Sequence, residues 1–227
     1  KYLLFKANYI KDKKKNDMKY NGVVFLHDFY DAPHEGGLQI FSDYFEWFDF
    51  LYNLIKKNNL NFAFKFHPNS KPESLRFNDF LINNYKCKFI NQNFSNFDIF
   101  KSKNFKVGIS VKGSVLQELL FLKKTPIYLA ENMISPLNIH KIPKNKNEYA
   151  SLILNYKKIK VNNYHIKNFM KLYYMAITDQ SYLKCEIAKK VNLKDMSDRN
   201  LKDLLTYNNK IDLYYNMKKK LFENKQI

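Results

Sequence analysis

The chain has 227 residues and a formal net charge of +18, from 39 lysines and arginines against 21 aspartates and glutamates. Hydrophobic residues make up 45% of it and charged residues 26%, a balance that supports a packed core and excludes a wholly disordered chain. Two cysteines, Cys87 and Cys185, are too few for a disulfide framework, and no apolar run approaches the roughly 20 residues of a membrane-spanning helix.

The first part of the chain alternates between short apolar runs and helical patterns. In chain order the sequence predicts a lysine-rich linker at 11–19, a strand at 22–26, a loop at 28–37, a helix at 38–57, a strand at 61–66, a helix at 72–85, a strand at 86–90, a short helix or turn at 96–102, a strand at 106–111, a helix at 113–122 and a strand at 125–130. Such alternation is typical of βαβ units on a parallel sheet. We therefore predict an α/β fold with a Rossmann-like doubly wound parallel sheet over residues 1–145.

After Pro143 the pattern changes, and only helices are predicted. They fall at 148–158, 164–177, 181–191 and 198–219. The second predicted region is accordingly a helical extension over residues 146–227. Because the chain starts with Lys1 rather than Met, we also expect it to be a fragment of a longer protein.

The excess of lysine has three interpretations. Arginine occurs only at Arg76 and Arg199, while Lys, Asn, Ile, Phe and Tyr are abundant, as codon bias in an AT-rich genome would produce. The first interpretation is a lysine-coated surface of that origin, and the second is attraction to anionic lipid or to a phosphorylated substrate. The third, specific nucleic-acid binding, is not expected, because proteins that read nucleic acids favour arginine.

Chemistry is expected at one edge of the predicted sheet. In an open parallel sheet, ligands bind beyond the carboxyl ends of the strands. The polar residues that follow the predicted strands are His27, Asp28, Asp31, His34, His67, Asn69, Lys112, Gly113, Ser114, Glu131 and Asn132.

The junction at 111–114 predicts an anion site. A strand followed by Gly113, Ser114 and a helix presents free backbone N–H groups and the positive helix end at the sheet edge. Lys112 adds charge, and Glu118, one turn further along, is placed to accept hydrogen bonds from sugar hydroxyls. In the alternative interpretation, Gly113 and Ser114 only start the helix and Glu118 is a solvated residue.

Two histidine motifs complete the predicted edge. Pro68 forces His67 into extended backbone at the end of its strand, where an imidazole can contact a phosphate or ribose. His27 with Asp28, and Asp31 with His34, have the composition of a general base with its orienting partner. The glycines at 36 and 37 suit a hinge that closes over a ligand. The alternatives are a histidine satisfied by a neighbouring loop and an Asp31 that caps a turn.

The sequence lacks the patterns that are typical of several other classes of site. There is no H-x-x-x-H, C-x-x-C or D-x-D set for a metal, so no metal cofactor is expected. The P-loop, the G-x-G-x-x-G fingerprint and the G-x-S-x-G elbow are absent as well, which disfavours kinases, dehydrogenases and esterases.

The segments from His27 to Lys57, Phe64 to Asn69 and Lys106 to Ala130 resemble a known family. Their HP dipeptide, strand–G-[ST]–helix with a later Glu, and "kTP" strand are similar to the bacterial capsule and surface-polysaccharide glycosyltransferases. More distantly they resemble bacterial sialyltransferases and the CDP-glycerol glycerophosphotransferases, although no Ser-Ser pair follows the fourth strand. The resemblance covers about residues 20–140.

The resemblance implies that this chain is the carboxy-terminal, donor-binding half of a GT-B fold. His67, Lys112, Gly113 and Ser114 would then contact the donor phosphate, Glu118 its ribose or base, and Asp31 or His27 would serve in catalysis.

The implied partners are a nucleotide-sugar donor, a polysaccharide or lipid-linked acceptor, an anionic membrane surface and a missing amino-terminal acceptor domain, with no metal or other cofactor and no nucleic acid. The implied location is cytoplasmic, on the inner membrane face. A non-catalytic scaffold module of polysaccharide assembly and a glycerophosphotransferase-like enzyme remain as alternatives.

Overall fold

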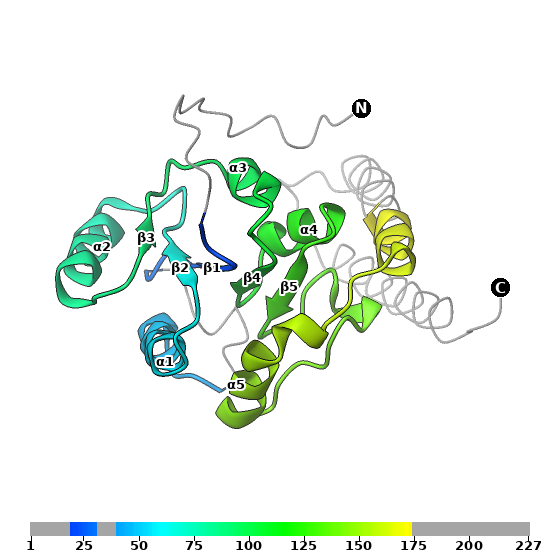
Figure 1. The fold of residues 1–227 in the computed structure, drawn as a ribbon. Coiled ribbons are helices and arrows are strands. Elements are labelled where there is room, and N and C mark those ends of the chain that lie inside the picture. Colours follow the sequence, from blue (N-terminus) through cyan, green and yellow to red (C-terminus); the bar gives the residue numbers. More distant parts are fainter. Residues whose placement is uncertain (1–18, 31–39, 174–227) are drawn as a thin grey trace, which may run out of the picture. The chain divides into compact units, whose positions relative to one another are not determined.

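A computed structural model describes residues 19–30 and 40–173 of the chain. Its centre is a five-stranded sheet with the order β3-β2-β1-β4-β5, in which every neighbouring pair is parallel (Figure 1). The strands are β1 (Gly22–Phe25), β2 (Phe62–Lys65), β3 (Phe89–Ile90), β4 (Val107–Ser110) and β5 (Thr125–Tyr128). This order, which reverses direction between β1 and β4, confirms the predicted doubly wound α/β fold.

Helices cover both faces of the sheet. They are α1 (Tyr44–Lys57), α2 (Pro72–Asn84), α3 (Asn96–Lys101), α4 (Ser114–Phe121) and α5 (Lys146–Leu154), with short 3₁₀ turns η3 (Ser135–Leu137) and η4 (Tyr156–Lys158). Figure 1 shows α1 and α5 on one side of the sheet and α3 and α4 on the other. The chain is helical again over 163–173.

Helix α1 starts later than the apolar spacing predicts. The prediction places its beginning at residue 38, whereas residues 40–43 are not helical and Asp43 is the N-cap. The Asp43 carboxylate accepts from the backbone N–H of Glu46 at 2.7 Å, and Glu46 in return accepts from the N–H of Ser42 at 2.6 Å. The first bond satisfies the Glu46 N–H, one of the first helical donors, and the second holds the residue before the cap. Local polar residues, and not the apolar pattern, therefore set the boundary.

The core under α1 and α5 is aromatic. Phe48 of α1 packs on Phe64 of β2 with ring centroids 4.9 Å apart, and Phe62 meets Tyr156 at 5.4 Å. Trp47, Phe48, Phe64 and Tyr149 are completely buried. Burial on this scale is the main stabilising term of the sheet layer.

Helix α5 belongs to this core, although the sequence analysis assigns it to the extension that begins at 146. Tyr149 is completely buried against α1, where its ring stacks on Phe50 and its hydroxyl accepts a hydrogen bond from the Trp47 indole Nε1 at 3.0 Å. The first of two compact units in the chain ends at Phe169 and the second begins at Met170. Sequence periodicity did not reveal that α5 belongs to the core, because a helix has the same apolar spacing whether it covers a sheet or lies in a separate unit.

Replacement of Tyr149 tests the contribution of α5. Tyr149→Phe leaves the Trp47 indole N–H buried without its acceptor, so we expect unfolding free energy to fall by about 1–2 kcal/mol. Tyr52→Phe is the matched control, because the Tyr52 hydroxyl accepts only an exposed contact from Lys56, and its expected effect is below about 0.5 kcal/mol. Urea unfolding followed by tryptophan fluorescence measures both, and equal effects would contradict the packing of α5 in the core.

Candidate functional site

Strand register brings three predicted residues into one row. Phe25 of β1 pairs with Lys65 of β2, and Val24 pairs with Ile109 of β4. His27, His67 and Lys112 therefore each lie two residues beyond equivalent positions of three adjacent strands. With strand spacings of about 4.8 Å, the row spans roughly 10 Å across the point where the strand order reverses.

His27 stands in the middle of this row. Its Nε2 lies 3.4 Å from the backbone nitrogen of Lys112 and 3.3 Å from Oγ of Ser110, and its ring stacks on Tyr44 of α1 at 4.8 Å. Burial, and then the charges of His67 and Lys112, lower the pKa of His27 to about 4. An imidazole that is neutral at pH 7 and accepts the Lys112 N–H suits the support of the β4–α4 turn better than the catalytic role that the sequence analysis assigns to it.

His67 lies half-buried at the end of β2. Its Nδ1 accepts from the backbone N–H of Asn69 at 3.3 Å, so the neutral ring carries its proton on Nε2. The Ser70 hydroxyl donates to the carbonyl oxygen of His67 at 2.9 Å. These two bonds fix the His-Pro turn, and the tautomer makes Nε2 a hydrogen-bond donor, the chemistry that contact with a phosphate oxygen requires.

The amino end of α4 is open. Gly113 is the N-cap with φ of +125°, no side chain caps the helix, and a Cβ built on Gly113 would meet no atom within 4 Å. Gly113 and Ser114 are both exposed. The exposed amino end of α4 therefore presents the positive end of its helix dipole next to Lys112 in the chain.

The backbone of Gly113 provides a direct test of this turn. At φ of +125° and ψ of 169° a side chain is strained, so Gly113→Ala should cost about 1–3 kcal/mol of unfolding free energy without any steric clash. Ser114→Ala, the neighbouring control, should change stability by less than about 0.5 kcal/mol, because Ser114 is exposed and is not the N-cap of α4. Thermal unfolding of both variants measures the difference, and an unaffected Gly113→Ala protein would contradict this geometry.

Asp28 has a structural task that the sequence analysis does not predict. Its carboxylate, 2% exposed, accepts from the N–H of Tyr30 at 3.0 Å, from the N–H of Lys71 at 3.0 Å and from the Ser74 hydroxyl. Lys71 is the N-cap of α2, so Asp28 occupies the amino end of that helix from a different loop. Burial favours a higher pKa, but these hydrogen bonds outweigh it, and the pKa of Asp28 is lowered.

Glu118 faces a buried lysine. Burial raises the pKa of Glu118, against a hydrogen bond from Asn96 and the charge of Lys65. Lys65, 2% exposed, donates to the carbonyl of Gln92 at 3.2 Å, and burial lowers its pKa to about 8. The Oδ1 of Asn96 is buried without a hydrogen-bond partner among the described residues. Glu118 is therefore not the solvated residue of the alternative interpretation.

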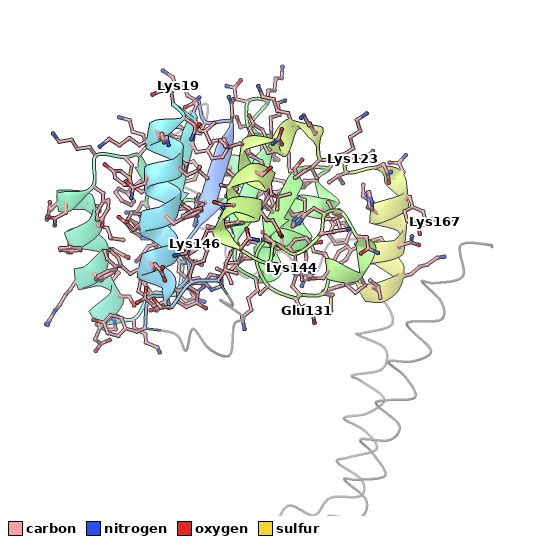
Figure 2. All side chains as sticks on the ribbon, turned by 90° about the horizontal axis from the view of Figure 1, so that it is seen from below. Lys19, Lys123, Glu131, Lys144, Lys146 and Lys167 are labelled. Atoms are coloured by element: carbon pink, nitrogen blue, oxygen red, sulfur yellow. The ribbon has the colours of Figure 1, made fainter. Side chains whose placement is uncertain are left out.

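Not every predicted site residue can be placed. Asp31, His34 and the glycines of the predicted hinge lie outside the described residues. Asn132 closes a turn, where its Oδ1 accepts from Ile134 N–H at 2.9 Å, and Glu131 lies exposed at the carboxyl edge (Figure 2). His27, His67, Lys112, Gly113 and Ser114 share that edge, as the fold requires.

Sequence reasoning missed Lys65 and Ser110. Lys65 is the one charged residue in the alternating segment NFAFKF, a signal that is visible in retrospect. Ser110, 2% exposed, donates to the Phe25 carbonyl at 3.1 Å and contacts His27. Nothing in the sequence around Ser110 indicates these contacts.

Within residues 19–30 and 40–173, no group of three or more His, Cys, Asp and Glu side chains could hold a metal ion. No helix in the same ranges has the length and apolar character to cross a bilayer.

A groove of about 670 Å³ lies at the other end of the sheet, where β2 and β3 begin. It is lined by Tyr20, Tyr52, Lys56, Lys86, Lys88 and their neighbours. Cys87 also lines it, and burial raises the pKa of that thiol to about 12, which makes it a weak nucleophile. This groove is not part of the row at the carboxyl edge.

Comparisons with known proteins do not assign the chain to a class. No protein-family model matches it, and no curated protein is significantly similar to it.

Proposed function

We propose that this chain is the donor-binding domain of a glycosyltransferase that transfers a sugar from a nucleotide-sugar to a capsular or other surface polysaccharide. The observation that carries the proposal is the row of His27, His67 and Lys112 beside the open amino end of α4. The resemblance of the HP and G-S-helix segments to polysaccharide glycosyltransferases supplies the substrate class.

The chemistry of the row suits a departing nucleotide phosphate. In sugar transfer, an acceptor hydroxyl oxygen bonds to the anomeric carbon and gives its proton to a base. The bond between that carbon and the phosphate oxygen breaks, and negative charge grows on the departing oxygen. The α4 N–H groups, the Lys112 ammonium and the His67 Nε2–H are preorganised donors for this charge, and no metal is needed for it. Glu118, one turn along α4, accepts hydrogen bonds from the ribose hydroxyls.

Calorimetry with the intact chain tests the proposal. Among CMP-, CDP-, UDP- and GDP-linked sugars, at least one should bind, and His67→Ala should weaken its affinity about 10- to 100-fold, as loss of a charge-assisted hydrogen bond does. His165→Ala is the matched control, because that ring accepts from Asn162 at 3.2 Å and rests against Tyr164. Silence across the panel, or a His67→Ala protein that binds as the wild type does, would refute the proposal.

A second candidate is a non-catalytic module of polysaccharide assembly. The observation in its favour is that His27, with a pKa of about 4 and its Nε2 accepting from Lys112, is a poor general base. Both candidates bind the donor, so an assay for sugar transfer from the donor that binds separates them. Sugar transfer that depends on Lys112 supports the enzyme, whereas donor binding without transfer supports the module.

A further inference from the structure

Charge is segregated between the two edges of the sheet. The turns and helix ends at the amino edge, at 19–21, 56–61, 85–88, 101–106, 122–124 and 155–161, contain 13 lysines and no aspartate or glutamate. We call these six segments the basic edge. Figure 2 shows Lys19 and Lys123 at this edge, with Glu131 at the opposite one. All but one of its lysines are exposed, and the exception is Lys124.

Acidic and basic residues are nearly equal in number at the carboxyl edge. Segments 26–30, 40–46, 66–73, 91–96, 111–114 and 129–148 hold six acidic residues and five lysines. Net charge in the described part of the chain is therefore concentrated away from the candidate donor site. Codon bias raises the number of lysines, but by itself it does not place them at one edge.

Helix capping explains only part of the basic edge. Lys56, Lys57 and Lys101 lie in the last turns of α1 and α3, where cations favour the helix dipole. Lys88 instead directly precedes β3 and lies outside the last turn of any helix. The pKa of Lys124 is lowered by burial and then by the charge of Lys106, so lysines of this edge are close enough to repel one another. Repulsion of this kind favours a polyanionic partner.

Apolar and aromatic groups lie within the basic edge and directly beside it. Leu122 is 39% exposed beside Lys123, and Leu154 is 41% exposed shortly before Lys157. Tyr20 and Tyr52 line the groove between Lys56, Lys86 and Lys88. Exposed leucines and tyrosines among lysines are the composition of surfaces that enter the headgroup region of a bilayer.

We propose that the basic edge docks this chain on an anionic lipid bilayer. Each lysine near such a surface contributes independently, and the attraction needs no directed pairing, which suits a compact ammonium. The basic edge contains no arginine, although forked guanidinium groups are the usual readers of nucleic acids. The inference does not depend on the donor-binding function, because it uses none of the residues of the carboxyl edge.

Two charge-matched variants of the full chain test it. Lys86→Glu/Lys88→Glu changes the basic edge, and Lys141→Glu/Lys144→Glu changes exposed lysines of the carboxyl edge. Both reduce the net charge by the same amount. The probe is co-sedimentation with phosphatidylcholine vesicles that contain about 30% phosphatidylglycerol, at low and high salt. Salt shortens the Debye length and so screens the attraction between lysines and anionic lipid.

The wild-type chain should bind the anionic vesicles, release them in high salt and ignore pure phosphatidylcholine. The basic-edge variant should bind at least about 30-fold more weakly, whereas the control variant should stay within about threefold of the wild type. Equal losses in the two variants would overturn the proposal. The proposal would also be overturned if the wild-type chain did not bind anionic vesicles, or if it bound single-stranded RNA tightly and vesicles not at all. Unchanged thermal unfolding of both variants shows that the fold is intact.

Discussion

Asp28→Ala should lower the free energy of unfolding by about 3–5 kcal/mol, the largest effect expected from one substitution in the described chain. The Asp28 carboxylate accepts from Tyr30, Lys71 and Ser74 while 2% exposed, and its removal leaves the start of α2 without an acceptor. The β2–α2 turn that holds His67 depends on the same contact, so donor binding should weaken as well.

Denaturant unfolding at pH 7 measures this effect, with Asp79→Ala as the control. Asp79 is an exposed carboxylate on the same helix α2, and its loss should cost below about 0.5 kcal/mol. Because the pKa of Asp28 in the folded chain is lowered from 3.8, its contribution is complete above that value and is lost as the pH falls through the folded pKa. A wild-type advantage over Asp28→Ala that disappears already at pH 6 would contradict this assignment.

His27 should make the protein less stable in acid. In the folded chain its pKa is lowered from 6.5 to about 4, first by burial and then by the charges of His67 and Lys112. Above pH 6.5 both folded and unfolded chains hold a neutral ring, and no free energy depends on it. Between pH 6.5 and about 4 only the unfolded chain takes up the proton, so about 3 kcal/mol of stability is lost across that window.

The comparison with His27→Gln isolates this contribution. The wild type should lose stability more steeply than the variant as the pH falls from 6.5, by up to about 1.4 kcal/mol per pH unit, and the two slopes should become parallel below about pH 4. NMR titration of the ring gives the folded pKa directly. A His27 resonance that titrates near pH 6.5 would show that the ring is solvated and does not support the turn at Lys112.

Local chemistry was enough to predict most of the sheet. All five strands begin and end within a few residues of their predicted bounds, because apolar β-branched runs between loop residues have few other solutions. The predicted start of α1 was wrong, because capping by Asp43 and Glu46 makes the helix begin at Tyr44, later than the apolar pattern predicts. The position of α5 depended on where Tyr149 is buried, and spacing along the chain does not carry that information.

The candidate site could also be predicted only in part from the sequence. The fold rule for strand ends identified His67, Lys112 and Gly113, since topology alone places those residues at one edge. It did not identify Lys65, whose burial beside Glu118 depends on how α3 and α4 pack over the sheet. It also did not reveal that His27 accepts the Lys112 N–H, because that bond exists only once β1 and β4 are side by side.

An NMR titration of the intact chain with the nucleotide of the tightest-binding donor, following backbone amide and histidine ring signals, tests the central claim most directly. We predict that the largest changes fall on the backbone N–H groups of Gly113 and Ser114 and on the ring of His67, at one common affinity. Changes confined to the groove at the amino edge, around Asn59 and Lys86 to Lys88, would contradict a donor site at the carboxyl edge.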